Sequence, residues 1–142
     1  DPEAECARFS RLIEEAGGLD LVVLGIGVNG HVAFNEPGTA FDSRARRAEL
    51  APSSREAYAR QFGSLDATPR FGLTLGIADL LAARAVLLLA LGTAKAEAIA
   101  RAIEGPVSED VPASALRSHP GLAVLLDRAA ASQLTRRYDA AS

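Results

Sequence analysis

One short stretch of the sequence, GIGVNGHVAFNEPG at residues 25–38, places side chains that could do chemistry directly after the apolar run LDLVVL. His31 and Glu36 lie five positions apart, and Asn29 lies two residues before the histidine. A carboxylate beside an imidazole fixes the ring tautomer and favours its charged form, which prepares a general acid/base. The amide oxygen of an asparagine can accept a ring N–H in the same way. The pattern predicts an acid/base site, and the alternative is a structural histidine that bonds a loop carbonyl.

The same stretch contains the spacing G-x-G-x-x-G at residues 25–30, which is also found in dinucleotide-binding turns. In those folds the third glycine opens a helix whose N-terminus meets the pyrophosphate. Here Pro37 follows closely and disfavours helical geometry at the residue before it. We therefore predict an irregular loop after Gly30, and no nicotinamide cofactor.

A second chemical candidate follows another apolar run, RAVLLLAL at residues 84–91. Lys95, in the sequence GTAK, is the only lysine among the 15 basic residues. Lysine carries a compact point charge, unlike the planar fork of arginine. A helix that begins near Thr93 would add backbone N–H groups and a positive dipole end. This combination predicts an anion site that contains Lys95.

Hydrophobic periodicity predicts the elements that position these residues. Helices are expected at residues 3–18, 53–62, 93–104, 112–118 and 128–138, and buried strands at residues 19–25, 84–91 and 121–127. Residues 71–83 should pass from extended chain into a short helix, and residues 43–50 should form a short strand or a loop. Hydroxyl side chains at the starts of the second and third helices, among them Thr93, are expected to act as caps.

The three strands are apolar throughout and alternate with helices, which is typical of a parallel sheet. The predicted fold is α/β, with a doubly wound, mostly parallel Rossmann-like sheet and helices on both faces. Ligands of such sheets bind beyond the carboxyl ends of the strands. His31 and Lys95 each follow such an end, so we expect them to line one pocket.

Composition narrows the class of protein. The net charge of −3 and the pI of about 5.4 argue against nucleic acid as a partner. The longest apolar run is too short to span a membrane, so no membrane partner is expected. Cys6 is the only cysteine and cannot form an internal disulfide. With no signal peptide recognised, a cytoplasmic location is expected.

The string LGIGVNGHVAFNEPG closely resembles the signature of the glucosamine-6-phosphate deaminases (isomerases), whose superfamily also contains the 6-phosphogluconolactonases. The resemblance continues through FGLTLGIADLLAA, LGTAKA, IEGPVSED and SHPGLAVLLD, and covers residues 19–127. The Asn-Glu-Pro string separates the deaminases from the lactonases, which share the Gly-His but usually lack it.

The resemblance implies conversion of glucosamine 6-phosphate to fructose 6-phosphate and ammonia, without a metal or an organic cofactor. His31 matches the acid/base that opens the sugar ring, and Glu36 matches the carboxylate that polarises it. Asn29 lies where many members carry Asp and others Asn. The imidazole of His31 therefore has one negative neighbour fewer than in the members with Asp. Gly30 and Asn35 match residues of the substrate loop.

Other positions match residues that bind phosphate groups in the family. Lys95 and Arg60 match ligands of the substrate phosphate. Arg46 aligns with a residue that binds an allosteric sugar phosphate in some hexameric members, but the nearby basic position of those members is Ala48 here. His119 is expected to be structural.

The resemblance also implies that residues 1–142 form the C-terminal part of a single deaminase-like domain. The family's enolising Asp and a phosphate-binding turn belong to a preceding half, so we expect this chain to be incomplete for catalysis by itself. The expected partner is a small sugar phosphate, and a homo-oligomer is one expectation. Two alternatives remain open: a 6-phosphogluconolactonase-like hydrolase and a non-catalytic sugar-phosphate sensor domain.

Overall fold

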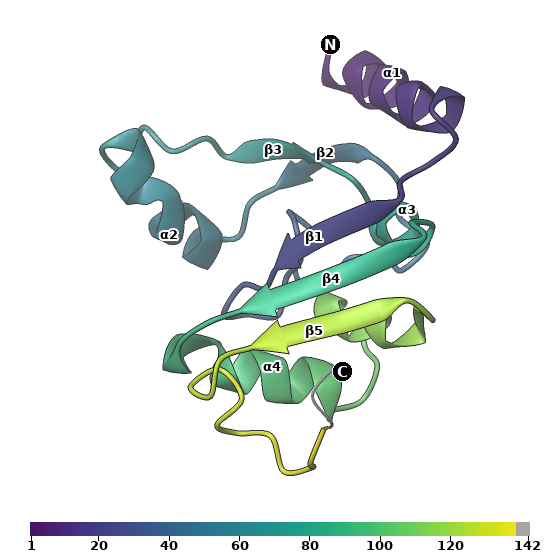
Figure 1. Cartoon of the computed structure of the whole chain (residues 1–142). Helices are drawn as coiled ribbons and strands as arrows, with labels where there is room; N and C mark the ends of the chain where they lie inside the picture. The colour runs from purple at the N-terminus through teal and green to yellow at the C-terminus, as the bar shows by residue number, and fades with distance from the viewer. Residues whose placement is uncertain (139–142) are drawn as a thin grey trace.

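A three-stranded parallel sheet forms the centre of the molecule. The computed structural model describes residues 1–138. The strands lie in the order β1–β4–β5, with bounds β1 (Leu21–Gly25), β4 (Ala85–Ala90) and β5 (Leu122–Leu126). In the middle of the sheet, Leu88 of β4 pairs with Leu24 on one side and with Val124 on the other. All three strands run in the same direction (Figure 1). The predicted α/β class with a parallel sheet is confirmed.

A two-stranded antiparallel ribbon lies beside this sheet, and the first two helices are adjacent to it or inserted in it. It consists of β2 (Arg46–Glu49) and β3 (Phe71–Thr74). The helix α1 (Pro2–Glu15) contacts both of these strands, and α2 (Pro52–Phe62) lies in the connection between them. Figure 1 shows α2 on the side of the molecule toward which the β1 arrow points. The ribbon therefore brings α2 close to the carboxyl ends of the parallel strands.

The remaining helical elements are short. They are α3 (Ile77–Leu81), η1 (Thr93–Lys95), α4 (Ala96–Ile103) and η2 (Pro112–Ser118), where η denotes a 3₁₀ turn. The expected hydroxyl caps are wrong, because α2, η1 and α4 have no side-chain hydrogen bond at their N-caps. α2 begins with Pro52, which has no N–H to satisfy and presets the helical φ. No helix in residues 1–138 is long and apolar enough to cross a bilayer.

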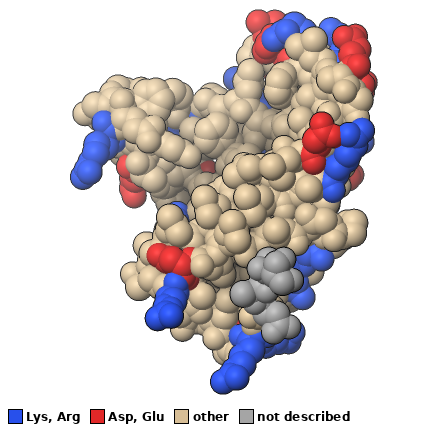
Figure 2. Space-filling view, in the orientation of Figure 1, with Lys and Arg blue, Asp and Glu red and all other residues tan. Residues whose placement is uncertain are grey.

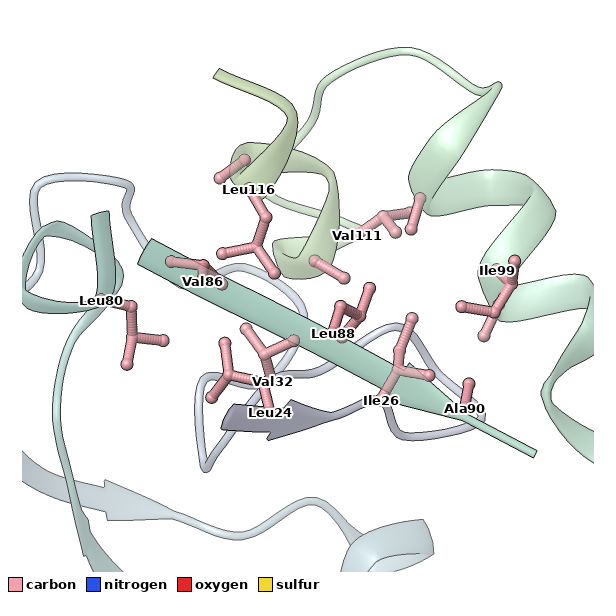
Figure 3. Packing of buried hydrophobic residues seen from close by; sticks show 14 of the residues in the cluster. Leu24, Ile26, Val32, Leu80, Val86, Leu88, Ala90, Ile99, Val111 and Leu116 are labelled. Carbon is pink, nitrogen blue, oxygen red and sulfur yellow. The ribbon is translucent and has the colours of Figure 1, made fainter. Parts of the chain in front are cut away.

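The hydrophobic core lies between one face of the parallel sheet and the short helical elements. Alternate side chains of the strands point into it, among them Val86, Leu88 and Ala90 of β4. Figure 3 shows these side chains among Ile99 of α4 and Leu116 of η2, both fully buried. The alternation follows from the two-residue period of a strand, which sends neighbouring side chains to opposite faces.

The opposite face of the sheet is exposed in the described residues. Leu21 and Val23 of β1 are 56% and 58% exposed, and Leu89 and Leu125 are also open to solvent. Figure 2 shows few charged side chains over the parallel strands on this face. The three strands were expected to be buried throughout, and within residues 1–138 their side chains on this face are not covered. In residues 1–138 the core helices lie on one side of the sheet, so the apolar side chains on its other side have no helix over them.

The last predicted helix, at residues 128–138, is also wrong. The chain forms turns there, and the carboxylates of Asp127, just before the segment, and of Glu104, far from it in sequence, accept from its backbone N–H groups. Asp127 accepts from the N–H of Ala130 at 2.7 Å. Glu104 accepts from the N–H groups of Thr135 and Arg136 at 2.9 and 2.8 Å. One i to i−4 bond forms at the start, from the N–H of Ala131 to the carbonyl of Asp127, and the tertiary bonds to Glu104 bind the later N–H groups that would continue a helical ladder.

The two faces of β4 make a testable contrast. We expect Leu88→Ala to lower the free energy of unfolding by about 2–5 kcal/mol, because this side chain is fully buried and its loss leaves a cavity. Leu89→Ala removes the same atoms from the exposed face and should cost under about 1 kcal/mol. Urea denaturation of the 142-residue chain measures both values. Equal losses would contradict the assignment of the core to one face.

Candidate active site

The loop after β1 reverses direction within a few residues and contains no helix. The N–H of Gly27 donates to the carbonyl of His31 at 2.9 Å, and the N–H of Gly30 donates to the carbonyl of Gly27 at 3.0 Å. Gly30 has a φ of 90°, a left-handed value that favours glycine. A Cβ on Gly27 would lie 2.2 Å from the ring of His31, so only glycine lets the imidazole pack there. The predicted irregular loop is confirmed, and the dinucleotide-type helix is missing from it.

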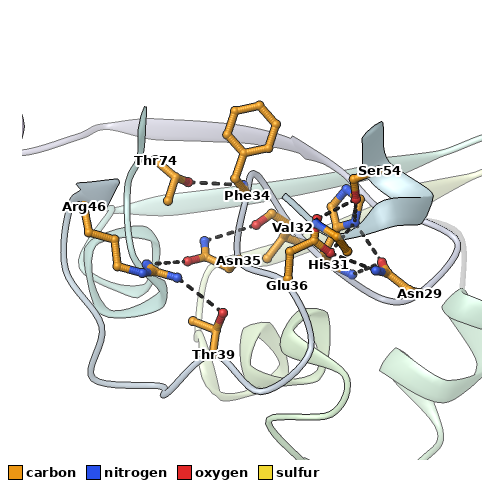
Figure 4. Close-up of polar contacts among 11 residues, drawn as sticks. Asn29, His31, Val32, Phe34, Asn35, Glu36, Thr39, Arg46, Ser54 and Thr74 are labelled. Carbon is orange, nitrogen blue, oxygen red and sulfur yellow. Dashed lines mark hydrogen bonds and ion pairs between the residues drawn. The ribbon is translucent and has the colours of Figure 1, made fainter. Parts of the chain in front are cut away.

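The imidazole of His31 is held at one nitrogen by the amide of Asn29. Nδ1 of His31 lies 2.7 Å from Oδ1 of Asn29, which also accepts the backbone N–H of His31 at 3.1 Å. The amide is oriented by Glu36, whose Oε2 accepts from Nδ2 of Asn29 at 2.8 Å (Figure 4). Since Oδ1 of Asn29 can only accept, Nδ1 of the neutral ring carries the hydrogen. Nε2 is then the nitrogen with a free lone pair.

Glu36 is the hub of this cluster. Its Oε2 also lies 3.4 Å from Nδ1 of His31, within ion-pair distance. Its Oε1 accepts from the hydroxyl of Ser54 at 2.5 Å and from the N–H of Ala51 at 3.2 Å. Burial raises the pKa of Glu36, but hydrogen bonds from His31, Ser54 and Asn29 outweigh burial and lower the pKa from 4.5 to about 2. The carboxylate is therefore ionised at neutral pH, and it is only 13% exposed.

A pocket of about 370 Å³ opens beside this cluster, at the carboxyl end of β1. Its wall is formed by residues 25–29, His31 and Ala33 of the loop, by Ser53, Ser54, Ala57 and Tyr58 of α2, and by Lys95 of η1. Its volume lies in the range of small-molecule sites. The predicted meeting of His31 and Lys95 at one pocket is confirmed.

Lys95 is held at the pocket by the turn that follows β4. Gly92 has a φ of 85°, and its N–H donates to both carboxylate oxygens of Asp127, at 3.1 and 3.0 Å. The N–H of Lys95 then donates to the carbonyl of Gly92. In residues 1–138 the ammonium of Lys95 forms no ion pair, so its charge is available to a ligand.

Gly30 and Asn35 do not line the pocket, and instead contact other elements that hold the loop in place. Asn35 is fully buried, and its Nδ2 donates to the carbonyls of Val32 and Leu75 at 3.1 and 3.0 Å. Gly30 packs against Val111, where a Cβ would approach to 2.9 Å. Both residues therefore fix the path of the loop that carries His31.

Arg46 and Arg60 lie outside the pocket wall. Arg46 donates to Oδ1 of Asn35 at 2.8 Å and to the hydroxyl of Thr39 at 3.3 Å, so its guanidinium anchors the loop (Figure 4). Arg60 is exposed and lies on the same face of α2 as Ser53 and Ala57, one turn beyond the pocket. The phosphate role of Arg60 and the allosteric role of Arg46 stay predictions.

Ser54 is the residue of this site that sequence reasoning missed. Its hydroxyl was expected to cap α2, whereas it donates to Glu36 across 18 positions of sequence. Ser54 is 3% exposed, on a helix whose other residues are at least partly exposed. The other histidine has the structural position expected for it: Nε2 of His119 lies 2.8 Å from the carbonyl of Ala83, and Nδ1 accepts from the N–H of Gly121.

Known proteins are similar to this chain in sequence over most of its length. The chain is 52% identical over 132 residues to a glucosamine-6-phosphate deaminase from Geobacillus sp. (strain WCH70), with 93% of this chain and 53% of that protein covered. It is 49% identical to glucosamine-6-phosphate deaminase 1 from Bacillus subtilis (strain 168), with 93% and 54% covered. The chain thus spans about half the length of the relatives it matches.

Solved structures agree with this comparison. A monomeric glucosamine-6-phosphate deaminase superposes with a TM-score of 0.91 at 49% identity, over 94% of this chain and 55% of that one. A 6-phosphogluconolactonase from Trypanosoma brucei superposes with a TM-score of 0.67 at 24% identity, over 94% of this chain and 52% of that one, which shows a shared fold alone. The model of the family "Glucosamine-6-phosphate isomerases/6-phosphogluconolactonase" matches residues 1–125. This chain belongs to that family.

Proposed function

We propose that the protein acts on glucosamine 6-phosphate and gives fructose 6-phosphate and ammonia. The observation that carries this proposal is that one pocket is lined by an oriented imidazole and by the ammonium of Lys95, which forms no ion pair within residues 1–138. His31 supplies a proton acceptor at Nε2, and Lys95 supplies a charge that a phosphate monoester would bind. The Asn-Glu-Pro string after the histidine, which the lactonases usually lack, favours the deaminase over the lactonase.

His31 is the proposed acid/base of ring opening. Nε2 takes the proton of the anomeric hydroxyl, and the same proton passes to the ring oxygen as the bond between that oxygen and the anomeric carbon breaks. The hydrogen on Nδ1 stays on that nitrogen throughout and is donated to Oδ1 of Asn29, so Nε2 alone performs the transfer. No net proton is gained or lost, which suits a single residue that acts as base and then as acid.

Glu36 and Asn29 are proposed to hold and stabilise this imidazole. When Nε2 is protonated the ring becomes a cation, and the Glu36 carboxylate 3.4 Å from Nδ1 offsets its charge. Asn29 transmits the orientation, because its amide nitrogen is fixed by Glu36 and its oxygen by the ring. An aspartate at this position would add a second negative charge, whereas the asparagine orients the ring without one.

The remainder of the reaction needs groups that match no position of these 142 residues. We infer that the chain forms the C-terminal part of a deaminase-like domain, in keeping with its match to about half of each relative. Enolisation and loss of the amine would then require the other half. Arg60 as a second phosphate ligand, a cytoplasmic location and a homo-oligomer are parts of this proposal that stay predictions.

The two histidines of the chain provide a matched test of catalysis. In the protein encoded by the complete open reading frame, His31→Gln should lower the rate of ammonia release from glucosamine 6-phosphate by about 10²–10⁴-fold, because the acid/base is lost. His119→Gln should instead lower the melting temperature and leave the rate per folded molecule unchanged. An unchanged rate in His31→Gln would refute the catalytic role. Hydrolysis of 6-phosphogluconolactone, without ammonia release from the amino sugar, would favour the lactonase alternative.

Lys95 can be tested by the loss of phosphate recognition. Lys95→Ala should raise the KM for glucosamine 6-phosphate by roughly 10- to 100-fold, the worth of a charge-assisted hydrogen bond. Arg101→Ala removes an equal charge from the exposed side of α4 and should leave KM within about twofold. Competitive inhibition by inorganic phosphate should weaken in parallel with KM. Equal effects of the two substitutions would show that only net charge matters.

The ionised state of Glu36 predicts a pH-dependent stability. Its pKa is lowered from 4.5 to about 2 on folding, so its contribution is complete above pH 4.5 and is lost as the pH falls toward 2. Urea denaturation should therefore show the wild-type chain losing stability relative to Glu36→Gln as the pH falls from 5 to about 3. Parallel curves for the two proteins over that range would contradict the assigned hydrogen bonds.

A further inference from the structure

The two carboxylate oxygens of Glu36 have different partners. Oε2 contacts two residues of the same loop: it accepts from Nδ2 of Asn29 at 2.8 Å and lies 3.4 Å from Nδ1 of His31. Oε1 faces α2 and accepts from the hydroxyl of Ser54 at 2.5 Å and the N–H of Ala51 at 3.2 Å. The acid/base loop supplies no partner for Oε1, so the orientation of the carboxylate depends on an element 15 or more residues away.

Ser54 is in an unusual setting for a hydroxyl on a surface helix. It is the one buried residue of α2, and a buried hydroxyl is retained only where it is paired. A serine in the first turn of a helix ordinarily bonds the local backbone. This hydroxyl donates to a carboxylate instead, and its oxygen lies 3.4 Å from Nδ1 of His31. It therefore contacts both members of the acid/base pair.

We propose that Ser54 is a positioning residue, whose hydroxyl holds Glu36 in the rotamer that orients Asn29 and, through Asn29, the imidazole of His31. This inference rests on the proposed function. It follows from the order of the contacts: Ser54 fixes Oε1, Oε2 fixes the amide nitrogen of Asn29, and the amide oxygen fixes Nδ1. Without the first bond Oε1 is left with the longer bond from the N–H of Ala51, so the carboxylate is held less tightly, and the amide of Asn29 can then turn over and release the ring tautomer.

Helix α2 contributes both to the pocket wall and to the support of Glu36. Ser53, Ala57 and Tyr58 form part of the pocket wall, and the start of the same helix holds Glu36. A shift of α2 would thus change the pocket and the acid/base geometry together. Pro52, at the first helical position, fixes the backbone at the point where Ala51 and Ser54 donate.

A double-mutant cycle in the protein encoded by the complete open reading frame tests the role. Ser54→Ala should lower kcat for ammonia release roughly 10-fold with KM changed less than about twofold, as expected for the loss of a hydrogen bond to a charged group. In a Glu36→Gln background the same change should cost less than about twofold, since it acts through Glu36. Ser54→Thr, which keeps the hydroxyl, should retain kcat to within about twofold.

The matched control is Ser114→Ala. Ser114 is fully buried and its hydroxyl bonds only the backbone of Ser108, at 3.0 and 3.1 Å. Its loss should lower the melting temperature without changing kcat. If Ser54→Ala behaves like Ser114→Ala, or if the effects of Ser54→Ala and Glu36→Gln on kcat simply multiply, the positioning role is overturned.

A second measurement separates this inference from the proposed function. In the ¹⁵N-labelled protein encoded by the complete open reading frame, the ring nitrogen shifts of neutral His31 should report hydrogen on Nδ1, and Ser54→Ala should give a mixture of tautomers. An unchanged tautomer in Ser54→Ala would refute the positioning role even if the protein releases ammonia. A tautomer change in a protein that releases no ammonia would leave the contact chain standing and refute only the function.

Discussion

The structure of this site depends on one partly buried carboxylate, that of Glu36, with four neighbours. Glu36 joins the loop after β1 to the start of α2, because it contacts Asn29 and His31 of the loop with one oxygen and Ala51 and Ser54 with the other. A charge in so closed a position costs free energy unless it is fully hydrogen-bonded. Here the bonds more than compensate, which is why the group stays ionised. The carboxylate thus fixes the geometry of the loop and the electrostatics of the histidine at once.

The support behind Glu36 is layered. Asn35, the residue before Glu36, is fully buried, and its side chain makes three hydrogen bonds, one of them from Arg46 of β2. The N–H of Gly38 donates to the carbonyl of Glu109, and the N–H of Ala113 donates to that of Gly30. An irregular loop of this length has no ladder of its own, so its backbone groups are satisfied by neighbouring elements. The path of the loop therefore depends on hydrogen bonds from several other elements.

The exposed face of the sheet has the opposite character. Its leucines and valines lie in the open beside an edge strand, β1, whose outer side pairs with no strand in residues 1–138. The pocket lies at the carboxyl end of that same strand. One face of the sheet is thus packed against the core helices, while within residues 1–138 the other face is apolar and uncovered. Apolar faces of this kind are ordinarily buried against other structure.

Much of this organisation could be read from the sequence. The apolar runs that precede residues 25 and 92 identified two parallel strands, and the rule that ligands bind at strand ends placed His31 and Lys95 together. Pro37 excluded a helix after Gly30. These inferences succeeded because they depend on local periodicity and backbone sterics, which act over a few residues.

Contacts between distant parts of the chain decided the rest. The sequence placed Ser54 at a helix start, where a cap is the ordinary role, and only folding brings its hydroxyl to Glu36. It gave residues 128–138 a helical pattern, and the carboxylate of Glu104 captured the backbone instead. What the sequence by itself determined was the set of elements and the side chains at their ends. The tertiary structure decided which buried donor meets which acceptor, because a hydrogen bond depends on separation in space rather than along the chain.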